Sequence, residues 1–191
     1  FSKGLRIVSL KISNSPFGAY KYPWKGGVTY GCGQGNNNPS GSHNGTQSFA
    51  FDFSLPTDTE VRAARGGVVE WLQQTQTTHY DPTSTITASN SPYPDNDLQN
   101  WGNAVRIRHA GGFTSWYFHL KSNSVVVKVG DHVVQGQLIA ASNNTGRTSG
   151  PHLHFQVQAD SEDWGQSVAC TFGLKCEVPT GGISVTSDNA K

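Results

Sequence analysis

The chain has 191 residues, a formal net charge of +1 and only 14% charged residues. This near-neutral balance gives no electrostatic reason for binding to nucleic acid or to a membrane surface, and no stretch approaches the roughly 20 apolar residues that span a bilayer. The length suits one domain that folds without the help of disulfides, and the many Gly, Ser, Thr and Asn residues are typical of short strands joined by turns and polar loops.

The chain begins with Phe1 and contains no methionine. This predicts a processed mature product, secreted after removal of a signal peptide and a pro-segment. Cys170 and Cys176 lie six positions apart, which favours a small loop disulfide in an oxidising compartment. A bond from Cys32 to either of them stays open.

The first thirty residues combine an alternating run at 4–12, which predicts an edge strand, with a cluster of aromatic side chains. We expect these aromatics to form a surface-covering arm that packs on the core. The alternative is a wall of a substrate groove, since Tyr and Trp combine apolar area with a hydrogen-bonding tip. The cluster consists of Phe17, Tyr20, Tyr22, Trp24 and Tyr30.

Residues 31–46 have nearly pure turn composition and deliver His43 into a loop. Residues 48–55 then predict a short strand that carries Asp52 among three phenylalanines. A carboxylate in such a setting is costly unless it is paired or binds a metal ion. Metal ligation is therefore the favoured interpretation of Asp52, and a hydrogen-bonded structural Asp is the alternative.

Residues 55–71 read as two strands around Gly66 and Gly67, which predicts a hairpin. The polar stretch 73–100 follows, and a loop of this length inside a compact domain is more often functional than idle. His79 within it is expected to be exposed, as is His132 in a later turn.

Two strands are predicted at 102–109 and 113–120, paired with each other, with Val105 and Ile107 on one face of the first. In the second strand the apolar trio of Trp116, Phe118 and Leu120 should point into the core. That places Tyr117 and His119 together on the opposite face. A half-exposed structural role is the alternative for His119.

Residues 149–157 predict a strand on which His152 and His154 project from one face. Imidazole is the commonest protein ligand for zinc-like ions, although His-x-His alone also fits an exposed strand face. Residues 181–185 predict a last strand. The whole indicates an all-β domain over 1–191, with antiparallel sheets that form a groove, long loops and little helix. It divides into an arm at 1–30, a core at 31–157 and an extension at 158–191.

Several short blocks follow one another over residues 43–157: His-Asn-Gly at 43–45, Phe-Asp-Phe at 51–53, Tyr-Phe-His-Leu at 117–120, Val-Gly-Asp-His-Val at 129–133 and Ser-Gly-Pro-His-Leu-His-Phe at 149–155. In their order and approximate spacing these blocks resemble the lysostaphin-type zinc endopeptidases. In that family the first His and the Asp are often four positions apart; here His43 and Asp52 are nine apart, which predicts a wider loop.

The resemblance implies that His43, Asp52 and His154 hold one Zn²⁺ per chain. It further implies that His152 takes the proton of the attacking water and that His119 stabilises the oxyanion. Three aromatic residues are candidates for substrate binding: Tyr117, Tyr30 and Trp24.

By the same resemblance we expect a secreted, monomeric metalloendopeptidase that lyses bacterial cell walls by cutting peptidoglycan cross-links. We expect cleavage at Gly, which extends to Gly-rich proteins such as elastin. We expect neither binding to nucleic acid nor insertion into a membrane. The alternatives are a non-catalytic relative that binds cell walls or activates an amidase, and an unrelated β-sandwich binding protein with incidental histidines.

Overall fold

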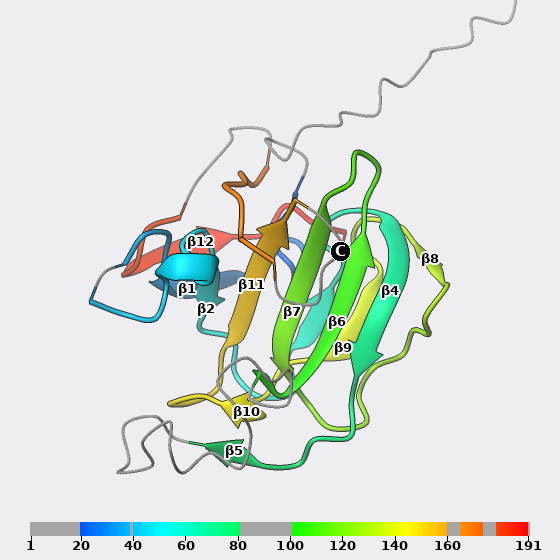
Figure 1. Cartoon of the computed structure of the whole chain (residues 1–191), viewed down its shortest axis with the longest axis horizontal. Coiled ribbons are helices and arrows are strands. Elements are labelled where there is room, and N and C mark those ends of the chain that lie inside the picture. Colours follow the sequence, from blue (N-terminus) through cyan, green and yellow to red (C-terminus); the bar gives the residue numbers. More distant parts are fainter. Residues whose placement is uncertain (1–19, 39, 81–100, 160–164, 174–178, 191) are drawn as a thin grey trace, which may run out of the picture.

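The computed structural model of the chain describes residues 20–38, 40–80, 101–159, 165–173 and 179–190. Their regular structure is β-strand apart from the 3-10 turn η1 at Gly45–Gln47 and the 3-10 residue Trp101 (Figure 1). This confirms the predicted all-β class with antiparallel sheets and long loops. Within the described ranges no helix has the length and apolarity needed to cross a membrane.

Twelve strands follow one another along the described chain, and eight of them form one sheet in the order β12-β1-β2-β11-β7-β6-β4-β8. The pairs β5 with β10 and β3 with β9 form two small sheets. The strands are β1 Thr29–Gln34, β2 Phe51–Phe53, β3 Glu60–Arg62, β4 Gly67–Gln73, β5 His79–Tyr80, β6 Asn103–Arg108, β7 Thr114–Leu120, β8 His132–Val133, β9 Leu138–Ala141, β10 Gly146–Arg147, β11 Leu153–Gln158 and β12 Ile183–Thr186.

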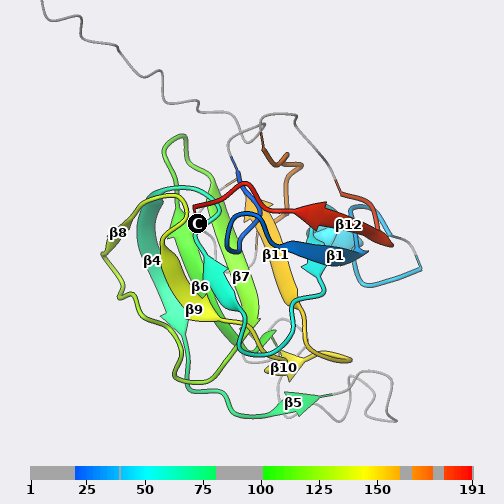
Figure 2. The same cartoon turned by 180° about the vertical axis from the view of Figure 1, so that it is seen from behind.

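The main core lies on the face of the large sheet that β3 and β9 cover (Figure 2). Alternation builds this face, because successive side chains of a strand point to opposite sides. On β11, Leu153, Phe155 and Val157 are fully buried in the core. Val105 and Ile107 of β6 join them, as predicted. The residues between these positions face the other side of the sheet.

The segment before β1 completes the core. Tyr20, Tyr22 and Trp24 are at most 2% exposed, and Tyr22 stacks on Phe172 with ring centroids 4.7 Å apart. The predicted arm therefore contributes to the core in its described part, and β12 pairs with β1, which confirms the predicted last strand. The predicted strand at 4–12 lies outside the described residues.

The hairpin predicted around Gly66 and Gly67 is wrong. β3 pairs with β9, whereas β4 pairs with β6 and β8. A Cβ on Gly67 would lie 2.2 Å from the carbonyl oxygen of Arg108, so this glycine permits the close approach of β4 to β6. The Gly-Gly pair thus marks a change of sheet and not a tight turn.

The prediction for the faces of β7 is also wrong. Tyr117 and Leu120 lie in the main core, while Trp116 and Phe118 form a second cluster on the opposite face, against Trp71 and Trp101. Every residue of β7 is buried. The prediction assumed that apolar side chains mark only one buried face of the strand. Because β7 is apolar on both faces, this pattern could not tell which face lies in the main core.

Two further predictions concern the exposure of two histidines and the pairing of the cysteines. His79 and His132 are exposed, as expected. Cys32 and Cys170 are buried, and no disulfide joins cysteines within the described part of the chain. Cys176 lies outside the described residues, so the loop disulfide stays a prediction.

Candidate metal centre and active site

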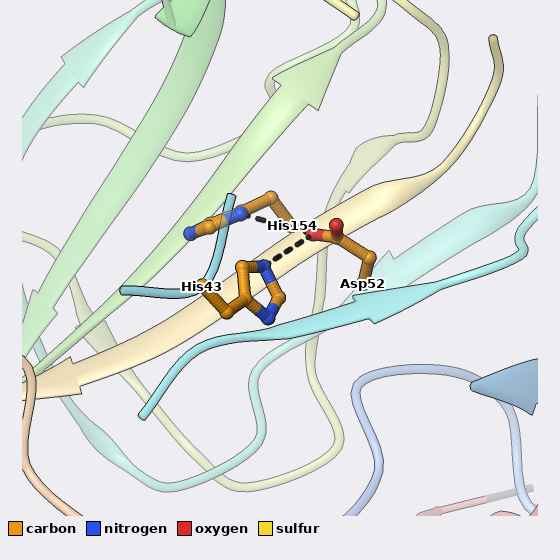
Figure 3. Close-up of side chains that lie close together, drawn as sticks. All are labelled: His43, Asp52 and His154. Carbon is orange, nitrogen blue, oxygen red and sulfur yellow. Dashed lines mark hydrogen bonds and ion pairs between the residues drawn. The ribbon is translucent and has the colours of Figure 1, made fainter. Parts of the chain in front are cut away.

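Asp52 and His154 face each other from neighbouring strands. β2 and β11 pair so that these two residues are direct partners in register, and Phe51 and Phe53 on either side of Asp52 point into the core. The carboxylate and the imidazole must therefore lie on the opposite face of the sheet. His154 Nδ1 is 3.0 Å from Asp52 Oδ1 (Figure 3).

His43 reaches the same carboxylate from the loop before η1. Its side chain is fully buried, and its Nε2 lies 3.2 Å from Asp52 Oδ1. Nδ1 is 2.9 Å from the carbonyl oxygen of Gly35, which can only accept, so Nδ1 carries the proton. The lone pair of Nε2 consequently faces the carboxylate.

His43, Asp52 and His154 each offer one ligand atom, and these three atoms all lie within 4.8 Å of one another. His43 Nε2 is buried and makes no hydrogen bond to the described residues, and a lone pair aimed at a carboxylate is unfavourable unless a cation lies between them. Two imidazoles and one carboxylate form a ligand set that suits zinc, with a fourth position left for water. The residues present therefore fit a metal ion.

Electrostatics agrees with a cation site. Burial would raise the pKa of Asp52, but the close approach of His154 and His43 to its carboxylate and the charge of the nearby histidines outweigh burial and hold this pKa well below the usual value. Asp52 is thus an anion at neutral pH, as a metal ligand must be.

His119 enters the site through an irregularity of β7. Its φ is 61°, in the left-handed region, and the register with β6 shifts over the same stretch, which marks a β-bulge. The bulge interrupts the alternation of side chains along β7. His119 therefore lies on the opposite face from Tyr117, whereas the prediction placed both on one face. The ring of His119 lies 4.5 Å from that of His152.

The ring proton of His119 lies in a hydrogen bond to the backbone and not in the pocket. Nδ1 lies 2.8 Å from the carbonyl oxygen of Thr145, and burial, followed by the neighbouring His152 and His154, lowers the pKa of His119 well below its usual value. A neutral ring that donates through Nδ1 presents Nε2 as an acceptor. His119 in this form accepts a proton and does not donate to an oxyanion.

His152 lies immediately before β11 and pairs with Asn143 in an isolated bridge. Its Nδ1 is 2.9 Å from the carbonyl oxygen of Gly150, and its Nε2 is 3.6 Å from Asp52 Oδ1. The ring therefore offers Nε2 to the same place as the three candidate ligands.

An open pocket of about 900 Å³ covers the centre. Asp52, His119, His152 and His154 line it, while the fully buried His43 contacts Asp52 from beneath. The rim carries small and polar residues, one tryptophan and one cationic side chain: Gly33, Ser42, Thr46, Thr148, Ser149, Trp101 and Arg147.

The aromatic residues predicted to bind substrate lie elsewhere, and these predictions are wrong. Tyr117 is fully buried and its hydroxyl accepts the N–H of Ala64. Trp24 is fully buried and donates to the carbonyl of Val28. Tyr30 packs edge-on against Trp24. Tyr117 and Trp24 belong to the main core, and Tyr30 is partly buried against it.

The sequence reading missed Trp101, whose ring lies 5.9 Å from that of His154 and which lines the pocket. It also missed Gln34 and Gln156, which contact the candidate ligands Asp52 and His154. Trp101 ends a long polar loop where no periodicity applies, and glutamine carries no metal-site motif. One signal was present, because Gln156 follows His154 by two positions on the same strand face.

Two nitrogen ligands and one oxygen ligand beside further histidines are typical of a hydrolytic metal centre. Residues 46–166 match the family model for Peptidase family M23. This range covers more than half of the chain and includes Asp52, His119, His152 and His154, while His43 lies just before it. The chain belongs to the M23 family of peptidases.

Similar proteins include the peptidoglycan DD-endopeptidase ShyA of Vibrio cholerae serotype O1, which is 35% identical over 115 residues, or 60% of this chain and 20% of the relative. Lysostaphin of Staphylococcus simulans is 32% identical over 119 residues, or 62% of this chain and 19% of the relative. The chain thus spans about a fifth of the length of these curated relatives.

Among solved structures, the catalytic domain of the prophage-encoded M23 protein EnpA from Enterococcus faecalis superposes with a TM-score of 0.54 at 21% identity, covering 78% of this chain and 94% of that one. Lysostaphin from Staphylococcus simulans superposes with a TM-score of 0.51 at 23% identity, covering 81% and 53%. At these identities the likeness establishes the fold.

Proposed function

We propose that this chain is a zinc-dependent endopeptidase that hydrolyses peptide cross-links of bacterial peptidoglycan. The observation that carries the proposal is the convergence of His43, Asp52 and His154 on one point beneath an open pocket that His119 and His152 also line. The likeness to ShyA, a peptidoglycan DD-endopeptidase, supports the substrate class.

In this proposal His43 Nε2, Asp52 Oδ1 and His154 Nδ1 hold the zinc. When bound, zinc lowers the pKa of a water ligand toward neutrality and polarises the scissile carbonyl. His152 donates Nδ1–H to Gly150 and so keeps the lone pair of Nε2 toward the pocket. That nitrogen accepts the proton of the attacking water and returns it to the leaving amine.

His119 shares the acceptor character of His152, because its Nδ1 proton is held by Thr145. We therefore assign His119 to orienting the attacking water and sharing its proton with His152. The resemblance predicts that His119 donates to the oxyanion, which would need a proton on Nε2. Because Nδ1 already carries a proton, a second proton on Nε2 would make the ring cationic, and the burial of His119 disfavours that form.

Cleavage next to glycine, activity on Gly-rich proteins such as elastin, a monomeric state and an extracellular place of action are finer parts of the proposal. They rest on the family resemblance. A pair of cross-bridge peptides, one with Gly and one with Ala at the cleaved bond, tests the first. Equal cleavage of both peptides would remove the preference for glycine.

Purified peptidoglycan provides the test of the main proposal. We expect the zinc-loaded protein to release new amino termini from the cross-links, with loss of activity in a chelator and recovery on addition of zinc. The retained ligand set distinguishes this expectation from the non-catalytic alternative. Binding to peptidoglycan without new amino termini would support that alternative instead.

A further inference from the structure

We propose that Gln34 and Gln156 are positioning residues that fix two of the three zinc ligands in their metal-binding form. Gln34 leaves one oxygen of Asp52 free for the metal, and Gln156 keeps the proton of His154 on the nitrogen that does not bind it. The inference deepens the proposed function and rests on the metal centre assigned there.

Gln34 holds the oxygen of Asp52 that faces away from the histidines. Its Nε2 donates to Asp52 Oδ2 at 3.0 Å and to Ser42 Oγ at 2.9 Å. Asp52 Oδ1 is the atom near His43, His152 and His154. Gln34 therefore occupies one carboxylate oxygen and leaves the other for a single metal bond.

The orientation of the Gln34 amide follows from its partners. The backbone N–H of Ser42 lies 3.1 Å from Gln34 Oε1, and the Nδ2 of Asn38 is equally close. Since a backbone N–H can only donate, Oε1 must face Ser42 and Nε2 must face Asp52. Gln34 thereby also ties the loop that carries His43 to the Asp52 strand.

Two glycines make room for this contact. Between β1 and β2 the pairing passes from Cys32 with Phe53 to Gln34 with Asp52, so Gly33 is an extra residue on β1 and forms a β-bulge. A Cβ on Gly41 would lie 1.7 Å from Gln34 Oε1. The local backbone is thus built around the glutamine.

Gln156 acts on His154 from inside the sheet. It is fully buried, and its Oε1 lies 3.1 Å from His154 Nε2. Metal binding through Nδ1 requires a lone pair there and hence a proton on Nε2, and that proton has its acceptor in Gln156. Partners of this kind fix the tautomer and the orientation of a metal-binding histidine.

The remaining ligand, His43, has its tautomer fixed by the backbone carbonyl of Gly35, which side-chain replacement does not remove. The two glutamines are consequently the parts of the surrounding network that substitution can test. Contacts of this type typically contribute 10–100-fold to metal affinity.

The test is the zinc affinity of the full chain, measured by competition with a chromophoric chelator. Gln34→Met and Gln156→Met keep the length of the side chain and remove the amide, and each should weaken zinc binding about 10–100-fold. Gln156→Glu keeps an oxygen acceptor for His154 Nε2–H and should retain affinity close to that of the wild type. Zinc affinity unchanged in both methionine variants would overturn the inference.

Gln158→Met is the matched control. Gln158 is fully buried on the same face of β11, but it accepts from Trp116 Nε1 at 3.0 Å and touches no ligand. We expect its zinc affinity to stay within about threefold of the wild type, well below the loss typical of ligand partners. A loss equal to that of Gln156→Met would show a packing effect and overturn the specific role of Gln156.

A further variant separates the two proposals. If His154→Ala loses zinc while Gln34→Met and Gln156→Met bind it normally, the metal centre stands and the positioning roles fail. If His154→Ala binds zinc like the wild type, the metal centre itself is wrong. Unfolding of each metal-free variant by urea shows whether it is folded before its affinity is compared.

Discussion

His119 shows how one backbone angle places a functional side chain. Its φ of 61° lies where few residues other than glycine are found, although Asn, Asp and His are enriched there. This angle, with the bulge on β7, directs the ring to His152 and away from the core. Strained positions of this kind persist where the surrounding structure enforces them, and they cluster at active sites.

Replacement of His119 tests that account. Asn tolerates the left-handed region, so His119→Asn should fold and bind zinc but lose roughly 10²–10⁴-fold in peptidase rate, the usual contribution of a proton-transfer group. His119→Val places a β-branched side chain at the same angle and should be about 1–3 kcal/mol less stable than His119→Asn. Urea unfolding and zinc content measure these effects, and equal stability of the two variants would contradict the strain argument.

At the scale of single elements, alternation explains why Asp52 and His154 lie on one face of the sheet, whereas the ligand set itself came from the family resemblance. Phe-Asp-Phe on β2 and Leu-His-Phe on β11 each place one polar residue between two core residues, so Asp52 and His154 must share the opposite face. Irregular features escaped the same reasoning. The bulges at Gly33 and His119 reverse alternation locally, and nothing in residue type alone specifies them.

Polar groups on the core face of β7 form a second buried network. His109 donates Nδ1–H to the carbonyl of Gly66 at 2.9 Å, and its Nε2 lies 2.9 Å from Ser115 Oγ. Ser115 Oγ is 3.1 Å from the hydroxyl of Tyr117, which accepts the N–H of Ala64. This chain of contacts joins the segment before β4 to β6 and β7.

Burial lowers the pKa of His109 to about 4. Below pH 6.5 the unfolded chain binds a proton that the folded chain does not bind until about pH 4, so stability is lost as the pH falls through this window. Between pH 6.5 and pH 5 the expected loss from His109 is about 2 kcal/mol. His109→Gln should show a smaller loss by that amount in urea unfolding of metal-free protein. The same pH dependence in both proteins would contradict the assignment.

The whole molecule brings together groups that are distant in the sequence. Asp52 and His154 are 102 positions apart, and His119 belongs to a third strand of the same sheet. Tyr22 and Phe172, from opposite ends of the described chain, stack in the core behind them. The site is therefore a product of the complete sheet and its core, and a metal ion bound there should stabilise the whole fold.

Linkage gives the size of this stabilisation. Free zinc at 100 times its dissociation constant should raise the free energy of unfolding by about 2.7 kcal/mol, because zinc binds the folded centre and not the separated ligands. Thermal unfolding with and without zinc measures the shift. Asp52→Ala should show none of it, since two imidazoles remain without the carboxylate. An equal shift in Asp52→Ala would place the stabilising zinc elsewhere.

We propose that His154 binds the metal while its neighbour His152 transfers protons. Zinc content per chain, measured together with release of new amino termini from peptidoglycan for His154→Ala and His152→Ala, tests it most directly. We predict that His154→Ala loses both zinc and activity, whereas His152→Ala loses activity and keeps its zinc. Full zinc occupancy in His154→Ala and in Asp52→Ala would contradict the ligand set.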